Sequence, residues 1–151
     1  MVLLSHQEAL AVQSGDGGAG GPSQEAQQAQ ILQLLNSARI ERGLVPLRPD
    51  PRLTAAAYAH SVDMANRERM GHDGSDGSLW DERARRYGYP LPLVGENVLV
   101  RPNRHAGAAY GQWWNSPPHQ ENMLFPDFRD IGIAYAISPD GNHYYTMLLG
   151  G

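Results

Sequence analysis

Two histidines and one glutamate stand in short polar motifs that are far apart in the sequence. His72 comes directly after a glycine, Glu96 is the centre of a Gly-Glu-Asn triplet, and His119 follows a pair of prolines. Neutral imidazole is a good zinc ligand, and two histidines, a carboxylate and a water form a familiar open coordination set. If the fold gathers the three groups, the sequence predicts a divalent-metal site. Metal binding should weaken below a pH of about 6.5, where an unperturbed histidine takes up a proton.

The same three groups allow other interpretations. Glu96 could lie behind a ligand and orient one imidazole or a water molecule. It could also tie a loop to backbone amides, with His72 and His119 exposed beside it. A nucleophilic triad of Ser116, His119 and Glu96 is disfavoured, because no strand-turn-helix elbow surrounds Ser116 and the prolines after it indicate a helix end. A zincin is excluded, because no His-Glu-x-x-His occurs.

Several nearby side chains have simpler expected roles. We expect Asn97 and Asn122 to satisfy loop backbone groups and so to support the cleft. His60 falls on the apolar stripe of a predicted helix and is expected to be packed and hydrogen-bonded. Of the adjacent Trp113 and Trp114, one should point into the core, while the other could offer a stacking platform for a sugar or a peptide.

Composition narrows the class of protein. A chain of 151 residues with 41% hydrophobic content fits one domain with its own core. No cysteine is present, which excludes disulfides, zinc fingers and cysteine nucleophiles. The net charge of −4 argues against nucleic-acid binding, and no apolar run approaches the roughly 20 residues that span a bilayer. The one basic cluster, Arg83, Arg85 and Arg86, follows two acidic residues and predicts a solvated helix face.

The beginning of the sequence does not resemble a folded element. Ser14 to Ser23 is rich in glycine, which indicates a flexible linker, so we expect residues 1–22 to precede a domain over residues 23–151. Met1 to Leu4 lacks the basic start and sustained apolar centre of a signal peptide. Any secretion signal is therefore expected outside this sequence.

Hydrophobic periodicity and turn residues predict the elements that must position the candidate groups. Helices are expected from Ser23 to Gly43, from Asp50 to about Met70, from Leu79 to Tyr87, and from His105 to Asn115. A strand is expected over residues 96–100, and a hairpin over 131–137 and 144–149 around a Pro-Asp-Gly-Asn turn. This pattern predicts an α+β fold with helices on both sides of a small antiparallel sheet.

From Gln30 to Leu149, about four-fifths of the chain, the sequence resembles the CAP superfamily, also called the SCP-like extracellular domains, in its cysteine-free prokaryotic form. The resemblance is carried by several motifs in the family's order: residues 57–64, His72, Gly95-Glu96-Asn97, Trp114-Asn115-Ser116, His119 with Asn122-Met123-Leu124, Ile131-Gly132-Ile133 and Tyr144-Tyr145-Thr146. It implies a three-layer α-β-α sandwich, secretion or surface exposure, and an open central cleft.

In this family the cleft is lined by two histidines and acidic residues, and in many members the histidines hold a divalent metal. His72 and His119 match the two histidine positions, and Glu96 matches the glutamate of the Gly-Glu-Asn motif. Ser116 stands where the resemblance places the second glutamate of animal and plant members. Three of the four cleft groups are therefore expected here.

Three functions follow as hypotheses. The favoured one is a secreted or surface-exposed module whose cleft binds a divalent metal such as zinc and a ligand or partner, without turnover. The second is a metal-assisted hydrolase, such as a peptidase, with Glu96 as general base. The third is a lipid carrier, since some family members bind sterols or fatty acids away from the four cleft groups. The missing fourth cleft group disfavours the second hypothesis, and no contiguous apolar groove in the sequence identifies the third.

Overall fold

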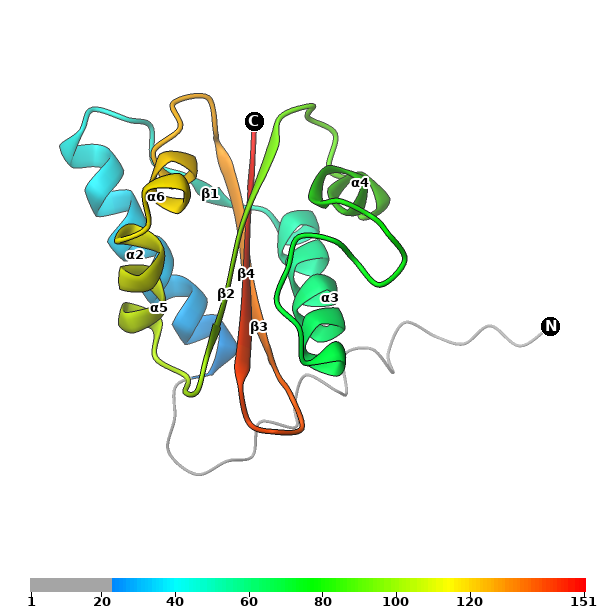
Figure 1. The fold of residues 1–151 in the computed structure, drawn as a ribbon. Coiled ribbons are helices and arrows are strands. Elements are labelled where there is room, and N and C mark those ends of the chain that lie inside the picture. Colours follow the sequence, from blue (N-terminus) through cyan, green and yellow to red (C-terminus); the bar gives the residue numbers. More distant parts are fainter. Residues whose placement is uncertain (1–22) are drawn as a thin grey trace.

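The computed structural model describes residues 23–151. The linker expected over residues 1–22 lies outside the described residues. Figure 1 shows three layers: a sheet at the centre, α3 (Pro51–Arg67) and α4 (Trp80–Arg86) on one face, and α2 (Gln24–Glu41), α5 (Ala106–Trp114) and α6 (Pro117–Met123) on the other. The expected α-β-α sandwich is confirmed.

The sheet has the strand order β1-β3-β4-β2. Strands β3 (Asp130–Ile137) and β4 (His143–Gly150) form the expected antiparallel hairpin, and β2 (Val94–Arg101) pairs antiparallel with the other side of β4. The two-residue strand β1 (Arg48–Pro49) pairs in parallel with β3. Strand β2, which carries Glu96, is therefore at the edge of the sheet.

Helix boundaries follow capping chemistry. The Ser23 hydroxyl accepts a hydrogen bond from the Ala26 amide, and the Asp50 carboxylate accepts from the first amides of α3. Helix α3 is shorter than expected, because Glu68 adopts a left-handed conformation with φ of 51° and ends it after Arg67. Residues 68–79 are thereby free to form the loop that carries His72.

Two elements were not anticipated from the sequence. Strand β1 is only two residues long and has no periodicity of its own. Pro117 and Pro118 do end α5, but they also occupy the first turn of α6, where proline lacks only an amide that would have no partner in the helix. Helix α6 carries His119 and Asn122.

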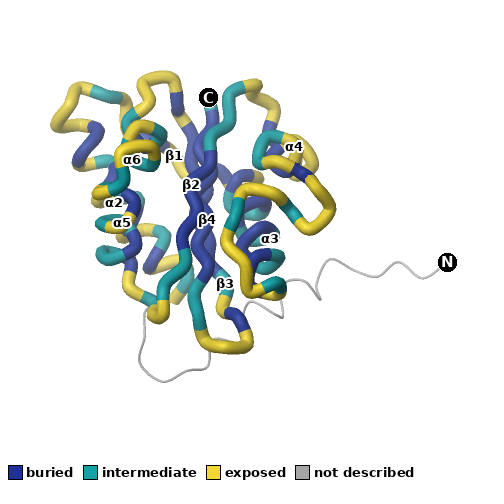
Figure 2. Tube along the Cα trace, in the orientation of Figure 1, coloured by how far each residue is buried: buried dark blue, intermediate teal, exposed yellow. Residues whose placement is uncertain are grey.

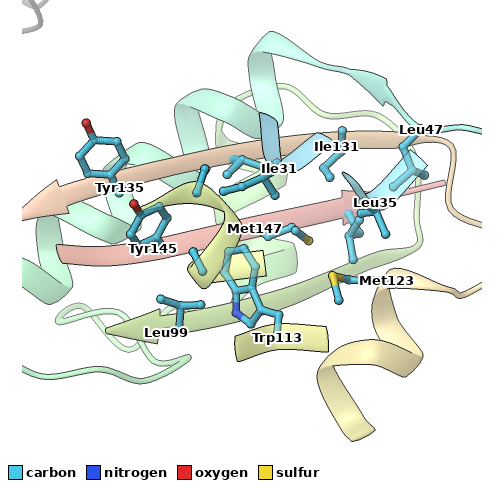
Figure 3. Packing of buried hydrophobic residues seen from close by; sticks show 14 of the residues in the cluster. Ile31, Leu35, Leu47, Leu99, Trp113, Met123, Ile131, Tyr135, Tyr145 and Met147 are labelled. Atoms are coloured by element: carbon cyan, nitrogen blue, oxygen red, sulfur yellow. The ribbon is translucent and has the colours of Figure 1, made fainter. Parts of the chain in front are cut away.

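The core lies on both faces of the sheet (Figure 2). Between the sheet and α2 and α5, the fully buried Trp113 meets Tyr145 edge to face (Figure 3). Its indole nitrogen donates to the Val98 carbonyl. Trp114 is only half-buried and stacks on Tyr110, so one of the two tryptophans points into the core, as expected. No helix among residues 23–151 is long and apolar enough to cross a membrane.

Close packing of α3 on the sheet depends on one glycine. A Cβ atom on Gly132 of β3 would lie 2.2 Å from backbone atoms of Leu53 and Thr54 in the first turn of α3. Only glycine permits this approach. The contact fixes α3, and with it the loop that follows, against the sheet.

Candidate functional site

Strand β2 separates two groups of polar side chains. Successive side chains of a strand point to opposite faces. Glu96 contacts residues on the α3 and α4 face, whereas Asn97 contacts α6 on the other face. Because β2 is an edge strand, side chains from both faces of the sheet can reach its unpaired edge. The Gly-Glu-Asn triplet thus links two groups of polar side chains, a first wall on the α3 and α4 face and a second wall on the α6 face.

The Glu96 carboxylate is fully buried, and both of its oxygens have partners. His72 Nδ1 donates to Oε1 at 2.8 Å, and Arg83 Nη2 donates to Oε2 at 2.8 Å. A buried carboxylate is tolerated when it is paired and hydrogen-bonded in this way. Glu96 is therefore a fixed acceptor between an imidazole and a guanidinium.

The expectation of a solvated helix face at Arg83, Arg85 and Arg86 is wrong for Arg83, which is buried. Its side chain is only 7% exposed, and besides Glu96 it binds the Ser78 carbonyl through Nη1 at 2.6 Å. Arg85 and Arg86 are exposed, as a solvated helix face requires. The missed signal was the helical stripe that Arg83 shares with Trp80 and the fully buried Ala84.

His60 is buried near Glu96 and is neutral. Its Nε2 is 2.7 Å from the Gly71 carbonyl, so this nitrogen carries the proton and donates it. Burial lowers the pKa of His60, and its 3.9 Å distance from Glu96 Oε1 is too long for a hydrogen bond. The expectation of a packed, hydrogen-bonded histidine is confirmed. The bond to Gly71 fixes the residue next to His72.

His72 is the exposed member of the first wall. Its side chain is 45% exposed, and its ring lies edge-on to Trp80 with ring centroids 5.5 Å apart. The hydrogen bond to Glu96 raises the pKa of His72. With Nδ1 bound to Glu96, Nε2 is the nitrogen that can bind a ligand.

His119 belongs to the second wall, which Asn97 and Asn122 connect to β2. Asn97 Nδ2 donates to the His119 carbonyl at 3.0 Å. Asn122 Nδ2 donates to Asn97 Oδ1 at 3.0 Å and to the Glu96 carbonyl at 3.3 Å. Burial lowers the pKa of His119, and so does the charge of His72. The two imidazoles are thus within electrostatic reach of each other.

The second wall is also held from behind by Arg39 of α2, which the sequence did not single out. This fully buried guanidinium donates to the carbonyls of Met123, Phe125 and Phe128. Two of these carbonyls lie at or just after the end of α6, where a cation is favourable. Arg39 therefore fixes the segment that follows the His119 helix.

Ser116 stands at the N-cap of α6 but makes no side-chain capping hydrogen bond there. The side chain that contacts the second oxygen of Glu96 is that of Arg83. Glu96 is bonded to His72 rather than to His119, which does not correspond to a Ser116-His119-Glu96 relay.

The side-chain atoms that can bind an ion decide which residues could form the expected metal site. Among residues 23–151, no group of three or more histidine, aspartate or glutamate side chains is spaced to hold an ion. The Glu96 side chain has no exposure and is bonded to His72 and Arg83, so the remaining candidate ligands are the imidazoles of His72 and His119. This donor set is two imidazoles, with Glu96 as the hydrogen-bond partner of His72.

A separate pocket lies at the other edge of the sheet, between α2 and strands β1 and β3. Its volume is about 210 Å³, and its apolar lining comes from Ala29, Leu32, Pro49, Ile131 and Ile133. Pockets that bury drug-sized ligands usually measure about 300–1,000 Å³. This pocket is small for a sterol or a long acyl chain.

Comparison with known proteins identifies the family of this chain. The model of the CAP family, described as the cysteine-rich secretory protein family, matches residues 32–149. The chain belongs to the CAP family. This CAP domain is 32% identical over 106 residues to the uncharacterized protein YkwD of Bacillus subtilis, a match that covers 70% of the chain. The chain spans only 40% of that relative.

Solved structures agree on the CAP fold. An outer surface protein from Borrelia burgdorferi matches with a TM-score of 0.77 at 19% identity, over 85% of this chain and 95% of that one. An extracellular SCP-domain protein from Bacillus anthracis matches with a TM-score of 0.69 at 26% identity, over 87% and 45%. The structure of NaASP2 with Zn²⁺ matches with a TM-score of 0.57 at 14% identity, over 88% and 83%.

Proposed function

We propose that this CAP domain is an extracellular binding module whose cleft holds a divalent metal between His72 and His119 and binds a ligand or partner there without turnover. An extracellular location is supported by the outer-surface and extracellular proteins that share the fold. The ligand would be a small molecule or peptide segment able to reach the exposed rim of His72.

The observation that carries this proposal is the burial of Glu96 between two hydrogen-bond donors, His72 and Arg83. A general base needs a free lone pair within hydrogen-bond reach of the proton it removes. Glu96 is fully buried, and its oxygens accept from His72 and Arg83. Each oxygen keeps a second lone pair, but the Glu96 side chain has no exposure to solvent, so a substrate proton could reach it only if a neighbouring side chain moved. Binding is therefore favoured over hydrolysis.

Zinc is the proposed metal because imidazole nitrogen suits it. Glu96 would orient His72 and increase its basicity, as carboxylates commonly do behind metal-bound histidines. When bound, zinc supplies Lewis acidity and open coordination positions for a ligand. His72 and His119 hold it, and Asn97 keeps the His119 backbone in place through its 3.0 Å hydrogen bond. The protein NaASP2, which shares the fold, was solved with Zn²⁺.

Calorimetric titration with zinc tests the proposal. We expect one binding event in the wild-type protein and its loss in both His72→Ala and His119→Ala. His105→Asn is the matched control, because it removes an imidazole at the N-cap of α5 but keeps a capping side chain. Unchanged zinc affinity in both alanine variants would rule out this metal site. Turnover of a peptide or ester library that disappears in Glu96→Gln would instead favour the hydrolase.

A further inference from the structure

The outer edge of β3 is paired with another strand only at its beginning. Strand β1 pairs with Asp130 and Ile131, and no strand in the described part of the chain pairs with residues 132–137 on that side. The pairing stops because Asp50, directly after β1, is the N-cap of α3 and turns the chain away from the sheet. The rest of β3 therefore has an open edge with which a further strand could pair.

Two contacts show which backbone groups of β3 point outward at this edge. The Ile131 carbonyl accepts a hydrogen bond from the Asp50 amide at 2.9 Å. The Tyr135 amide donates to Gln24 Oε1 at 2.8 Å. Backbone groups alternate in direction along a strand, so those of Ile133, midway between the two, point to the same side. Gln24, at the start of α2, thus takes the position of a carbonyl from a neighbouring strand.

The apolar pocket between α2, β1 and β3 lies where β1 would continue if it were longer. Pro49 is opposite Ile131, so a residue two positions further along would be opposite Ile133, which lines the pocket. The other walls come from both sides of this edge, Leu32 of α2 on one and Thr54 of α3 on the other. A volume of about 210 Å³ is below that of sites for drug-sized ligands and is suited to one apolar side chain.

The charge at the pocket is acidic. Among the described residues that line it, Glu25 of α2 is the only charged one, and it is exposed. The neighbouring Arg48 is paired with Asp130 at 3.5 Å. A basic residue next to the apolar side chain therefore has a partner in Glu25, which contributes more to selectivity than to affinity at an exposed position.

We propose that the open edge of β3 binds an extended peptide segment of a partner protein, which adds a strand beside residues 133–137. Main-chain hydrogen bonds to Ile133 and Tyr135 hold the segment, one apolar side chain fills the pocket, and a basic residue next to it meets Glu25. The segment displaces the Gln24 side chain from the Tyr135 amide. The site is at the opposite edge of the sheet from β2 and the candidate metal site, so each can exist without the other.

Synthetic peptides added to the 151-residue protein test the proposal by amide NMR. The panel is acetyl-Lys-Val-Thr-Leu-Thr-Val-Lys-amide and its versions with Ile, Phe or Met at the centre. Binding should shift the amide resonances of Ile133 and Tyr135. N-methylation of the central residue and the following threonine keeps every side chain but removes two adjacent amide donors, one of which faces β3 in either register. This change should weaken binding at least about tenfold, and glutamate in place of both lysines should weaken it about threefold.

Three variants test the residues at this edge. Ala29 is an exposed residue of α2 that lines the pocket, so Ala29→Trp should obstruct it and weaken peptide binding at least about tenfold. Ser37→Trp, at an exposed position about two turns further along α2, is the matched control and should leave affinity unchanged. Gln24→Ala removes the side chain that competes for the Tyr135 amide and should raise affinity about threefold.

Several outcomes would overturn the proposal. These are the absence of β3 amide shifts with every peptide of the panel, equal binding of the N-methylated peptide, and shifts confined to the surroundings of His72 and His119. A dimer of the protein that Ala29→Trp dissociates would instead assign the edge to a second copy of this chain. Peptide binding should not change when EDTA is added, so failure of the proposed metal site would leave this edge site in place.

Discussion

Glu96 and Asn97 are neighbours in β2, yet they hold opposite walls of the candidate site. Glu96 accepts a hydrogen bond from the His72 ring on the α3 and α4 face, and Asn97 donates to the His119 backbone on the α6 face. The alternation of a strand makes this division unavoidable. A one-residue shift in the register of β2 would exchange the two walls and destroy the site.

The first prediction concerns proton binding by the histidines. His72 should titrate above the usual value of about 6.5, chiefly because of its hydrogen bond to Glu96, whereas His60 and His119 should titrate below it, chiefly because of burial. Glu96→Gln should move the His72 midpoint back toward about 6.5. NMR titration of the imidazole protons measures all three. A His72 midpoint at or below about 6.5 in the wild type would contradict the hydrogen bond.

These shifts have opposite effects on stability. A raised pKa means that the folded state holds the His72 proton more tightly than the unfolded state does. The resulting stabilisation is complete below about pH 6.5 and is lost as the pH rises through the folded-state pKa of His72. The lowered pKa values of His60 and His119 favour the folded state above about pH 6.5, and this contribution is lost as the pH falls through their folded-state values. His72 is substantially exposed, so solvent screening reduces its share.

The second prediction concerns Asn97, whose side chain is fully buried and hydrogen-bonded at both ends. Asn97→Ala leaves the His119 carbonyl and the Asn122 amide each without one partner. We expect a loss of about 1–3 kcal/mol in the free energy of unfolding, measured by urea denaturation. The exposed Asn103→Ala is the control and should change stability by less than about 0.5 kcal/mol. Equal effects of the two substitutions would refute the role of Asn97.

The third prediction concerns Gly95, the glycine of the Gly-Glu-Asn triplet. A Cβ atom on Gly95 would lie 2.8 Å from the ring of the buried Phe128, whose backbone carbonyl is bound by Arg39. Gly95→Ala should therefore destabilise the fold by about 1–3 kcal/mol through overpacking. Gly111→Ala in α5 is the control, since its Cβ would meet nothing within 4 Å, and it should be neutral or stabilising. Equal stability of Gly95→Ala and the wild type would show that Phe128 moves freely.

The sequence was sufficient where local chemistry decides the structure. Ser23 and Asp50 marked helix starts, and the Pro-Asp-Gly-Asn turn marked the hairpin. The sequence was insufficient where a contact between distant parts of the chain decides whether a side chain is buried. The burial of Arg83 depends on Glu96, 13 positions away, and that of Arg39 on carbonyls more than 80 positions away. From the sequence alone, a buried arginine on a short charged helix cannot be told from a solvated arginine, because its binding partner is distant in the sequence.

The family resemblance predicted a site at His72, Glu96 and His119, but it did not predict that Arg83 binds the second oxygen of Glu96. That detail bears on the chemistry, because the guanidinium fixes the carboxylate that accepts the hydrogen bond of His72. The position of a site follows from the fold, whereas its chemistry follows from the partners of each polar atom.

The central claim is that His72 and His119 bind one metal ion together. Imidazole nitrogen NMR during addition of one equivalent of zinc at neutral pH tests it most directly. We predict that the resonances of His72 and His119 shift together to values of metal-bound nitrogen, while those of the buried His60 stay near their metal-free positions. Zinc that shifts only one of the two rings, or neither, would contradict the claim.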